Sequence, residues 1–306
     1  MAAIELDGVR KEFGDVTAVD GVDLTVPEGS IYGFLGPNGA GKSTTINMLL
    51  DFVRPTAGEV RVLGRNAQSD SVTIRERLGV LPEGFDVYDR LTGRKHVEFA
   101  IESKDADADP DAVLARVGLP DAGDRKAGGY SKGMRQRLAL GMALVGDPDL
   151  LILDEPSSGL DPAGAKEMRE IVREEAERGT TVFFSSHVLG QVEAVCDRVG
   201  IMREGRLVAE DSVEGLRDAA GADATLRIDT AGIADGAVES VESVAGVTGV
   251  TVDGDSLSVS CDSDAKTAVL TALESAGVTV ENFETESASL EDLFLAYTEE
   301  DREVTA

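Results

Sequence analysis

The sequence predicts an α/β protein in which a mostly parallel, helix-covered sheet is followed by a smaller α+β domain of βαββαβ order. From residue 4 to about residue 216, short β-rich runs alternate with helical stretches, which is typical of a parallel sheet covered by helices. Near Ala219 the composition changes, and the rest of the chain has its own order of strands and helices. At 306 residues, the chain is long enough for two cores.

Three apolar runs in the first part predict buried strands. They show no polar alternation, because parallel strands covered on both faces are apolar throughout. The runs are IYGFL at 31–35, LLILD at 150–154 and TVFFSS at 181–186. Helices are expected to begin near Lys42 and to span about 131–145 and 163–178.

The segment DAAGADA at 218–224 has little apolar pattern and is interpreted as a linker, so domains are expected at 1–219 and 220–306. The second domain is acidic and carries no catalytic constellation, which favours an interaction or regulatory role. A turn at 252–255 suits its central hairpin, and SLEDLFLAYT is expected to form a last amphipathic helix. Its other elements are strands at 224–229, 247–253, 256–261 and 278–286 and helices at about 236–245 and 264–276.

The charge of the chain excludes several partners. With 29 basic and 58 acidic residues, the formal net charge is −29. Sequence-independent DNA binding and peripheral lipid binding both depend on clustered Lys and Arg, so neither nucleic acid nor direct lipid insertion is expected. Either a solvated acidic coat or a halophilic source explains this charge. If the protein holds its fold and activity equally well without molar potassium chloride, the halophilic explanation fails.

No membrane span or secretory leader is expected, because the sequence has no apolar run of about 18 residues and no basic-then-apolar start. Cys196 and Cys261 stand apart from each other and from histidines, which favours two reduced thiols over a zinc site or a disulfide framework. The chain is therefore expected to be cytoplasmic or peripheral to a membrane through a protein partner.

A phosphate-binding loop is predicted directly after the first apolar run. The segment GPNGAGKS fits the pattern G-x-x-x-x-G-K-[ST], between a predicted strand and a predicted helix. Glycines let successive N–H groups face phosphate oxygens, and the helix N-terminus adds partial positive charge. Lys42 is expected to reach the β- and γ-phosphates of ATP, and the Ser43 hydroxyl to bind Mg²⁺. The residues expected to contact nucleotide here are Gly36, Pro37, Asn38, Gly39, Ala40, Gly41, Lys42, Ser43 and Thr44.

Two acids follow the run LLILD. Asp154 is placed to deliver a carboxylate to Mg²⁺ at the end of a buried strand, and Glu155 to polarise a water for attack on the γ-phosphate. Alone, two acids after a strand could equally begin a solvated helix. Together with the loop at Lys42, they indicate an ATPase.

With these motifs in order, the first 216 residues resemble the nucleotide-binding subunit of an ATP-binding cassette (ABC) transporter. YSKGM at 130–134 stands where that family has its LSGGQ signature, SGLD at 158–161 matches the D-loop, and SSH at 185–187 matches the switch strand. The resemblance implies a P-loop ATPase fold with a helical subdomain that carries the signature. YSKGMRQR and the terminal SLEDLFLAYT resemble the exporter branch that includes drug and sodium efflux subunits.

The resemblance also implies a head-to-tail dimer that encloses two ATP molecules. Ser131 and Gly133 would contact the γ-phosphate bound to the other subunit, and Asp161 would organise the interface. His187 would sense the γ-phosphate, and Phe13 would stack on adenine, although a lone histidine or phenylalanine near a strand is more often structural. Ser131 is also a natural N-cap, and this role is compatible with phosphate binding.

Three positions depart from the family pattern. Glu83 replaces a glutamine and adds negative charge near the expected metal, where it is a third candidate ligand beside Ser43 and Asp154. In the signature, Lys132 replaces a glycine and Met134 replaces the glutamine. The segment 84–102 corresponds to the region that receives a helix of the permease.

The expected function is ATP hydrolysis that energises a separate membrane permease, on the cytoplasmic side of the membrane. The resemblance implies that this transporter is an exporter. The alternative is a soluble ABC ATPase that acts on ribosomes or another non-transport target. Ribosome-acting members usually carry two cassettes and DNA-repair members long coiled coils, and this sequence has neither. A nucleotide-binding regulator without turnover conflicts with the presence of Glu155. The transported substance is not encoded in this chain.

Overall fold

A computed structural model describes residues 1–219, 224–234 and 236–286. The chain divides into two compact units, Met1–Val213 and Glu214–Ala306. The linker expected at 218–224 overlaps the segment 220–223, which lies outside the described residues. In the described part, no helix has the length and apolarity needed to cross a membrane.

A six-stranded, mostly parallel sheet forms the centre of the first unit, as the sequence predicts. Its order is β10-β9-β3-β8-β7-β6, and only β10 runs antiparallel to its neighbour. The three predicted strands are β3, β7 and β8, which are buried along their whole length. The strands are β3 (Ile31–Leu35), β6 (Leu78–Leu81), β7 (Leu150–Asp154), β8 (Thr181–Ser186), β9 (Arg198–Arg203) and β10 (Arg206–Ser212).

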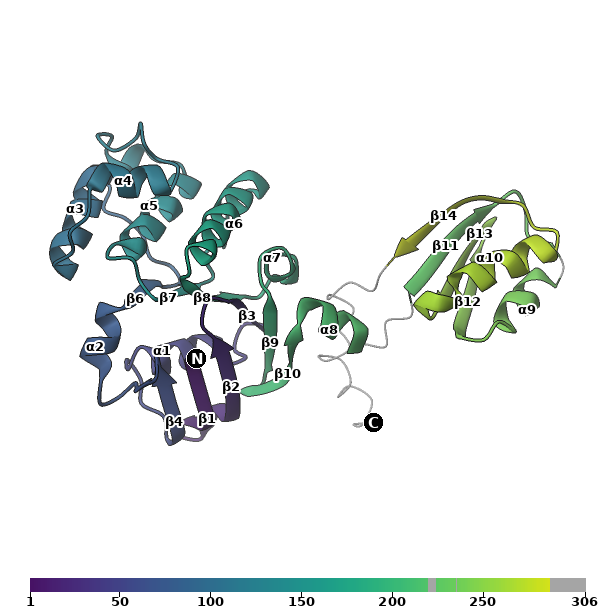
Figure 1. The fold of residues 1–306 in the computed structure, drawn as a ribbon, viewed down its shortest axis with the longest axis horizontal. Helices are drawn as coiled ribbons and strands as arrows, with labels where there is room; N and C mark the ends of the chain where they lie inside the picture. The colour runs from purple at the N-terminus through teal and green to yellow at the C-terminus, as the bar shows by residue number, and fades with distance from the viewer. Residues whose placement is uncertain (220–223, 235, 287–306) are drawn as a thin grey trace. The chain divides into compact units, whose positions relative to one another are not determined.

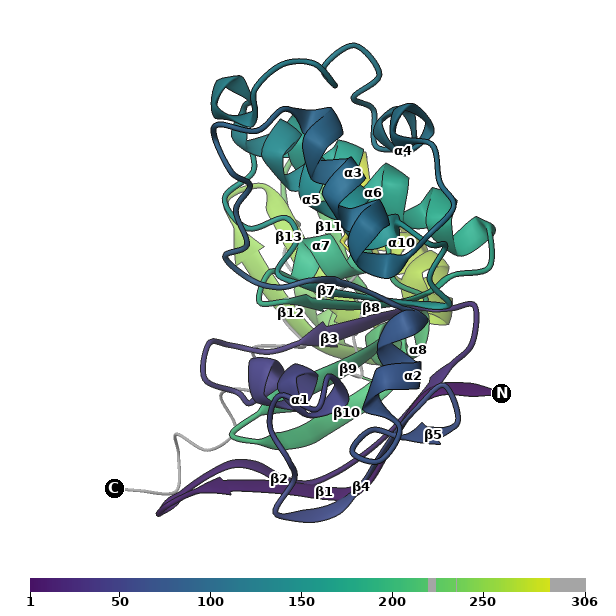
Figure 2. The same cartoon turned by 90° about the vertical axis from the view of Figure 1, so that its left-hand side faces the viewer.

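A second, antiparallel sheet of order β2-β1-β4-β5 lies on one side of the central sheet. Helices α1 and α2 occupy the space between the two sheets (Figure 2). One apolar core, with side chains from β1, β2, β4, α1 and the central strands, joins these layers. The elements are β1 (Ala2–Phe13), β2 (Val16–Pro27), α1 (Lys42–Leu49), β4 (Ala57–Val62), β5 (Arg65–Asn66) and α2 (Ser71–Glu76).

Helices cover the opposite face of the central sheet (Figures 1 and 2). α3 packs against α4 and α5, and α5 also contacts β6 and α6, so the helix after the signature segment is fixed to the sheet. The elements are α3 (Gly93–Lys104), α4 (Pro110–Arg116), a 3₁₀ turn (Ala127–Gly129), α5 (Lys132–Leu144), α6 (Pro162–Glu177) and α7 (Leu189–Glu193).

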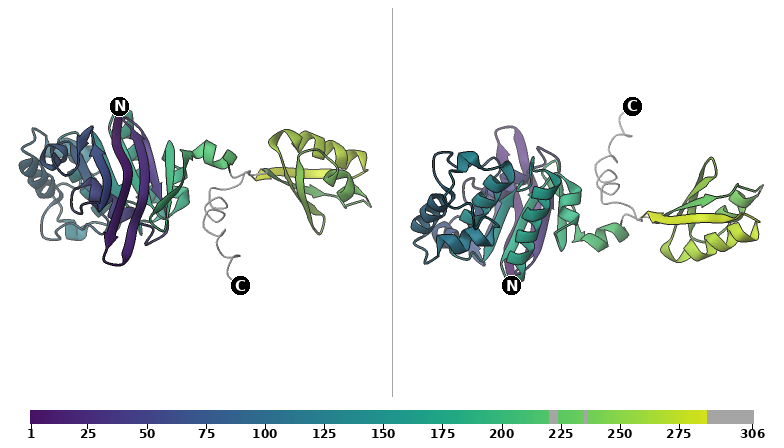
Figure 3. Two further views of the ribbon diagram at one scale, coloured as in Figure 1. Left: turned by 90° about the horizontal axis from the view of Figure 1, so that it is seen from below. Right: turned by 90° about the horizontal axis from the view of Figure 1, so that it is seen from above.

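The second unit has the predicted βαββαβ order. Its antiparallel sheet has the order β12-β13-β11-β14, and α9 and α10 pack on one face of it (Figure 3). Alternate residues of β13 face these helices, which explains the polar serines between its buried residues. The elements are β11 (Ala224–Thr230), α9 (Ala237–Glu242), β12 (Val247–Asp253), β13 (Ser256–Cys261), α10 (Lys266–Ser275) and β14 (Val280–Glu286), preceded by α8 (Val213–Ala219). SLEDLFLAYT, at 289–298, lies outside the described residues.

Candidate functional site

The candidate site lies at the carboxyl ends of the parallel strands, where ligands bind in open α/β sheets. The loop between β3 and α1 passes so close to neighbouring backbone that two of its positions accept only glycine. A Cβ on Gly36 would lie 2.4 Å from the carbonyl oxygen of Met202, and one on Gly41 would lie 2.5 Å from that of Ala18. Gly41 also has a φ of 105°, a left-handed conformation that favours glycine.

Lys42, the first residue of α1, is buried under this loop. Its ammonium donates hydrogen bonds to the carbonyl oxygens of Gly36 (2.6 Å) and Pro37 (3.3 Å). It also lies 3.7 Å from Oε1 of Glu155. The cation is thus held between the loop and the end of β7, where an anion of the substrate can replace the carbonyl oxygens as its partner.

Asp154 ends β7 and is fixed by the neighbouring strand β8. The Ser185 hydroxyl donates to Oδ1 of Asp154 at 2.5 Å and accepts from the backbone N–H of Glu155 at 3.1 Å. Burial raises the pKa of Asp154; the Ser185 hydrogen bond lowers it, and the charge of Glu83 raises it further. A cation near the Asp154 carboxylate would therefore offset both the cost of burying its charge and its repulsion from Glu83.

Glu155 lies between two basic side chains. Its Oε2 is 2.8 Å from Nδ1 of His187, which follows β8, and its Oε1 faces Lys42 without a hydrogen bond. Glu155 is 6% exposed and has a φ of 52°, an uncommon backbone conformation for a residue with a side chain. Strain of this kind persists where the surroundings fix the residue, and it is frequent at functional sites.

A cavity of about 270 Å³ brings together six of the nine loop residues that were predicted to contact nucleotide. Pro37, Gly36 and Ala40 belong to the same loop but do not line the cavity. Asp154, at the end of β7, does not line the cavity, but Ser43, which does, helps to lower the pKa of its carboxyl group. The lining residues are Ala18, Asn38, Gly39, Gly41, Lys42, Ser43, Thr44, Glu83 and Glu155.

Phe13, the residue expected to stack on adenine, lies at the end of β1 and does not line this cavity. Its side chain is 48% exposed, and the Lys11 ammonium lies 4.8 Å from the ring centroid. Phe13 is therefore not a core residue, and it is accessible to a planar ligand.

The signature residues lie apart from Lys42, around a second cavity of about 540 Å³ that shares no lining residue with the first. Ser131 and Asp161 are N-caps: Ser131 accepts from the N–H of Met134, and Asp161 from the N–H of Gly164. Ser131, Gly133 and Asp161 all line this cavity. Within one chain, the structure therefore does not bring the signature to the phosphate-binding loop.

Two residues of the site were not predicted. Ser185 was expected only as part of the SSH motif, and its bridge between Asp154 and the Glu155 backbone appears in the structure alone. Ala18, at the start of β2, forms part of the cavity wall. A serine directly after the apolar residues 182–184 of β8 is the signal that could have drawn attention to Ser185.

Comparison with known proteins agrees with these observations. Residues 19–158 match the ABC transporter family, and residues 212–298 match the C-terminal domain of DrrA1-3-like ATP-binding proteins. The chain is 36% identical to the daunorubicin resistance ATP-binding protein DrrA3 of Streptomyces coeruleorubidus, over 99% of this chain and 98% of that protein. It is 41% identical to the bacitracin transport ATP-binding protein BcrA of Bacillus licheniformis, over 70% of this chain and 71% of that protein.

Among solved structures, an ATP-binding subunit of an ABC transporter matches with a TM-score of 0.64 and 26% identity. The match covers 72% of this chain and 93% of that one.

Proposed function

The chain belongs to the family of ABC transporter ATP-binding proteins, and from this premise we propose that it hydrolyses ATP to drive export through a separate membrane permease. The observation that carries the proposal is the convergence of Lys42, Asp154 and Glu155 beside one cavity at the ends of β3 and β7. The names of the relatives, which refer to drug resistance and to bacitracin transport, support export.

The chemistry follows from the side chains around the cavity. ATP phosphates would be held by the N–H groups of the loop and by the Lys42 ammonium, which would exchange its carbonyl partners for phosphate oxygens. Glu155 would accept a proton from the attacking water, and its hydrogen bond with His187 would orient the carboxylate. Phe13 would stack on adenine.

A magnesium ion fits the residues present. In the described part of the chain, no group of three or more His, Cys, Asp or Glu side chains is arranged to hold a metal on its own. Mg²⁺ commonly takes one or two carboxylates, with phosphate oxygens and water completing its shell. The Ser43 hydroxyl, the buried Asp154 carboxylate and Glu83 offer such a partial set of hard oxygen ligands. When bound, the ion would neutralise charge on the phosphates.

Catalysis in this proposal requires a second copy of the chain. Ser131, Gly133 and Asp161 would face the nucleotide held by the partner, because their cavity is separate from that of Lys42. Binding of ATP would close the head-to-tail dimer, and hydrolysis would open it.

Replacing Glu155 by Gln tests this proposal. E155Q should bind ATP, form a stable dimer with Mg-ATP in light scattering, and lose most of its turnover, because the base is absent while the ligands remain. E155A serves as a comparison that also removes the hydrogen bond with His187. Turnover equal to that of the unmodified chain would contradict the role of Glu155.

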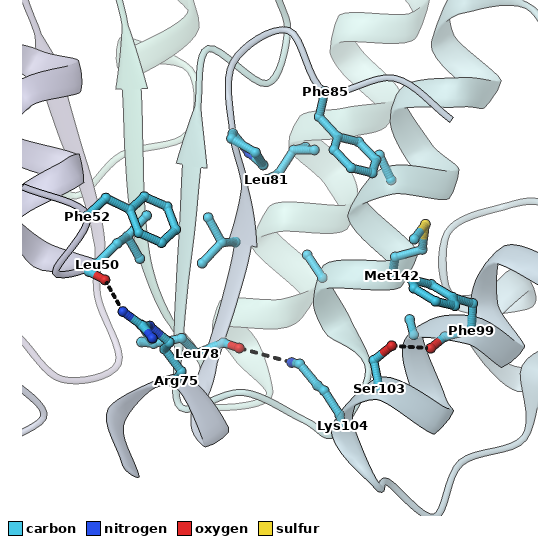
Figure 4. Close-up of a pocket in the computed structure, with 15 residues that line it drawn as sticks. Leu50, Phe52, Arg75, Leu78, Leu81, Phe85, Phe99, Ser103, Lys104 and Met142 are labelled. Atoms are coloured by element: carbon cyan, nitrogen blue, oxygen red, sulfur yellow. Dashed lines mark hydrogen bonds between the residues drawn. The ribbon is translucent and has the colours of Figure 1, made fainter. Parts of the chain in front are cut away.

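The permease would dock on an apolar groove of about 410 Å³ between α2, β6, α3 and α5 (Figure 4). Phe52, Phe85 and Phe99 line this groove, and each is at least 39% exposed. The groove includes part of the segment that the sequence assigns to permease contact.

Tagged protein purified from solubilised membranes should carry a multi-span membrane protein with it. F99D should abolish this association and leave ATP binding intact, whereas V252D, which places the same charge on the exposed surface of the second unit, should not. Recovery of ribosomes in place of a membrane protein would refute the transport function.

A further inference from the structure

Lys11, two residues before Phe13 in β1, has its ammonium over the phenylalanine ring. The nitrogen lies 4.8 Å from the ring centroid, inside the distance of about 6 Å over which a cation is attracted to an aromatic face. The proposed ATP chemistry gives Lys11 no role. Its contact with Phe13 nevertheless connects it to the residue on which adenine would stack.

The contacts of Lys11 are unusual for a lysine of so acidic a chain. Acidic residues outnumber basic ones by 58 to 29. In the part of the chain that the structure describes, however, no carboxylate lies within ion-pair distance of the Lys11 ammonium. The ammonium instead donates a hydrogen bond to the carbonyl oxygen of Arg54, at 2.8 Å. It is therefore held between a backbone oxygen and an aromatic ring.

The segment that holds Lys11 is itself fixed to the end of β1. Arg54 lies shortly before β4, which is a neighbour of β1 in the sheet. The Thr56 N–H donates to the carbonyl oxygen of Arg10 at 2.7 Å, and the Thr56 hydroxyl accepts from the Glu12 N–H at 3.0 Å. Lys11 is therefore held from the β4 side of β1.

The nucleotide cavity involves the other neighbour of β1. Ala18, which lines that cavity, belongs to β2, and the order of the sheet is β2-β1-β4. The Phe13 ring, at the end of β1, is half-exposed. This arrangement favours the Lys11 ammonium on one face of the ring and a planar ligand on the other.

We propose that Lys11 is a positioning residue for the nucleobase, because its ammonium holds one face of the Phe13 ring while adenine stacks on the opposite face. The inference rests on the proposed stacking of adenine on Phe13. An aromatic face carries partial negative charge, and a cation on the far face reduces it, which favours stacking with a base. A ring that is already held also loses less side-chain freedom when the base arrives.

Two ligands with the same number of phosphates test the proposal in the full-length chain without hydrolysis. Mg-ADP carries the base, and magnesium pyrophosphate lacks it. K11M should raise the Kd for Mg-ADP about two- to fivefold in calorimetry, as expected for an exposed cation–π contact, and leave the Kd for magnesium pyrophosphate unchanged. K11R should stay within about twofold of the parent, because it keeps the cation. In the F13A chain, K11M should have no further effect.

A tryptophan at position 13 gives a direct readout of the stack, because the chain contains no other tryptophan. Mg-ADP should quench the fluorescence of F13W. Adding K11M to F13W should raise the Mg-ADP concentration for half-maximal quenching at least twofold, since tryptophan forms the strongest cation–π contacts.

K166M is the matched control, because it removes one positive charge from the exposed surface of α6, and it should change neither Kd. Thermal unfolding of each variant checks that the fold is kept. Weaker binding of both ligands by K11M would assign Lys11 to the phosphates and overturn the inference. Tighter binding of Mg-ADP would also overturn it, because the ammonium would then compete with the base for one face of the ring.

The F13A chain separates failure of the inference from failure of the proposed function. If F13A weakens the binding of Mg-ADP and K11M does not, Phe13 stacks on the base without Lys11, and only the inference fails. If F13A binds Mg-ADP as tightly as the parent, the proposed stacking on Phe13 fails, and the inference fails with it.

Discussion

Replacing Ser185 by Ala should damage the site more than its loss of one hydroxyl suggests. The side chain is fully buried and makes two hydrogen bonds, one to the Asp154 carboxylate and one from the Glu155 N–H. A hydrogen bond to a charged group contributes about 1.5–3 kcal/mol and a neutral one about 0.5–1.5 kcal/mol. S185A should therefore lower the free energy of unfolding by about 2–4 kcal/mol.

For a domain of this size, 1 kcal/mol shifts the Tm by about 2–4 °C, so the expected fall is roughly 5–15 °C in calorimetry. S185A should also raise the Mg²⁺ concentration needed for half-maximal ATP hydrolysis, because Asp154 is no longer held. S186A is the matched control: its hydroxyl is equally buried but bonds to Val188 and Gln191. If both variants shift the Mg²⁺ requirement equally, Ser185 has no specific role at Asp154.

Three further predictions concern single side chains. Because burial raises the pKa of Asp154, its ionised form destabilises the folded chain, and stability is lost as pH rises from the unfolded pKa of about 4 through the folded value. D154N should therefore unfold at a higher temperature than the parent at pH 7, and this difference in Tm should close near pH 4. The same variant should bind Mg-ATP more weakly. F13A should raise the Kd for ATP about tenfold through lost stacking, whereas F52A, which removes another exposed phenylalanine, should not. If F13A and F52A bind ATP with equal Kd, Phe13 does not belong to the site. A Cβ on Gly133 would lie 3.9 Å from the Cα of Gly164, which is an ordinary contact, so G133A should keep the Tm of the parent. In the E155Q chain, G133A should nevertheless prevent ATP-dependent dimerisation. A dimer of normal stability would show that the phosphate does not contact Gly133.

The sequence was most informative where one physical constraint fixes the residue type. Strands β3, β7 and β8 are buried on both faces, so their apolar runs mark their bounds directly. The order of elements in the second unit also agrees with its alternating patterns and turn residues. The antiparallel sheet of β1, β2 and β4 was not predicted separately, although alternate burial in β2 from Val22 to Val26 carries its signal.

Contacts that depend on strand register could not be predicted. Ser185 meets Asp154 because parallel pairing of β7 with β8 sets these two residues side by side. The sequence contains both residues but not their offset, which is fixed by packing of the whole sheet. The same holds for the cavity that Glu83 and Lys132 line, because its walls, the loop after β6 and the start of α5, meet only once α5 packs on β6.

The separation of the two halves of the site has a geometric origin. Lys42, Asp154 and His187 follow parallel strands and necessarily emerge at one edge of the sheet, so a single chain can assemble them. Ser131 and Asp161 instead cap two helices whose N-termini line a different cavity. Helix N-termini attract anions, yet the anion-binding loop of the same chain shares no wall with this cavity. In the proposed dimer, a phosphate that contacts both halves is therefore shared with another copy, and ATP closes the dimer.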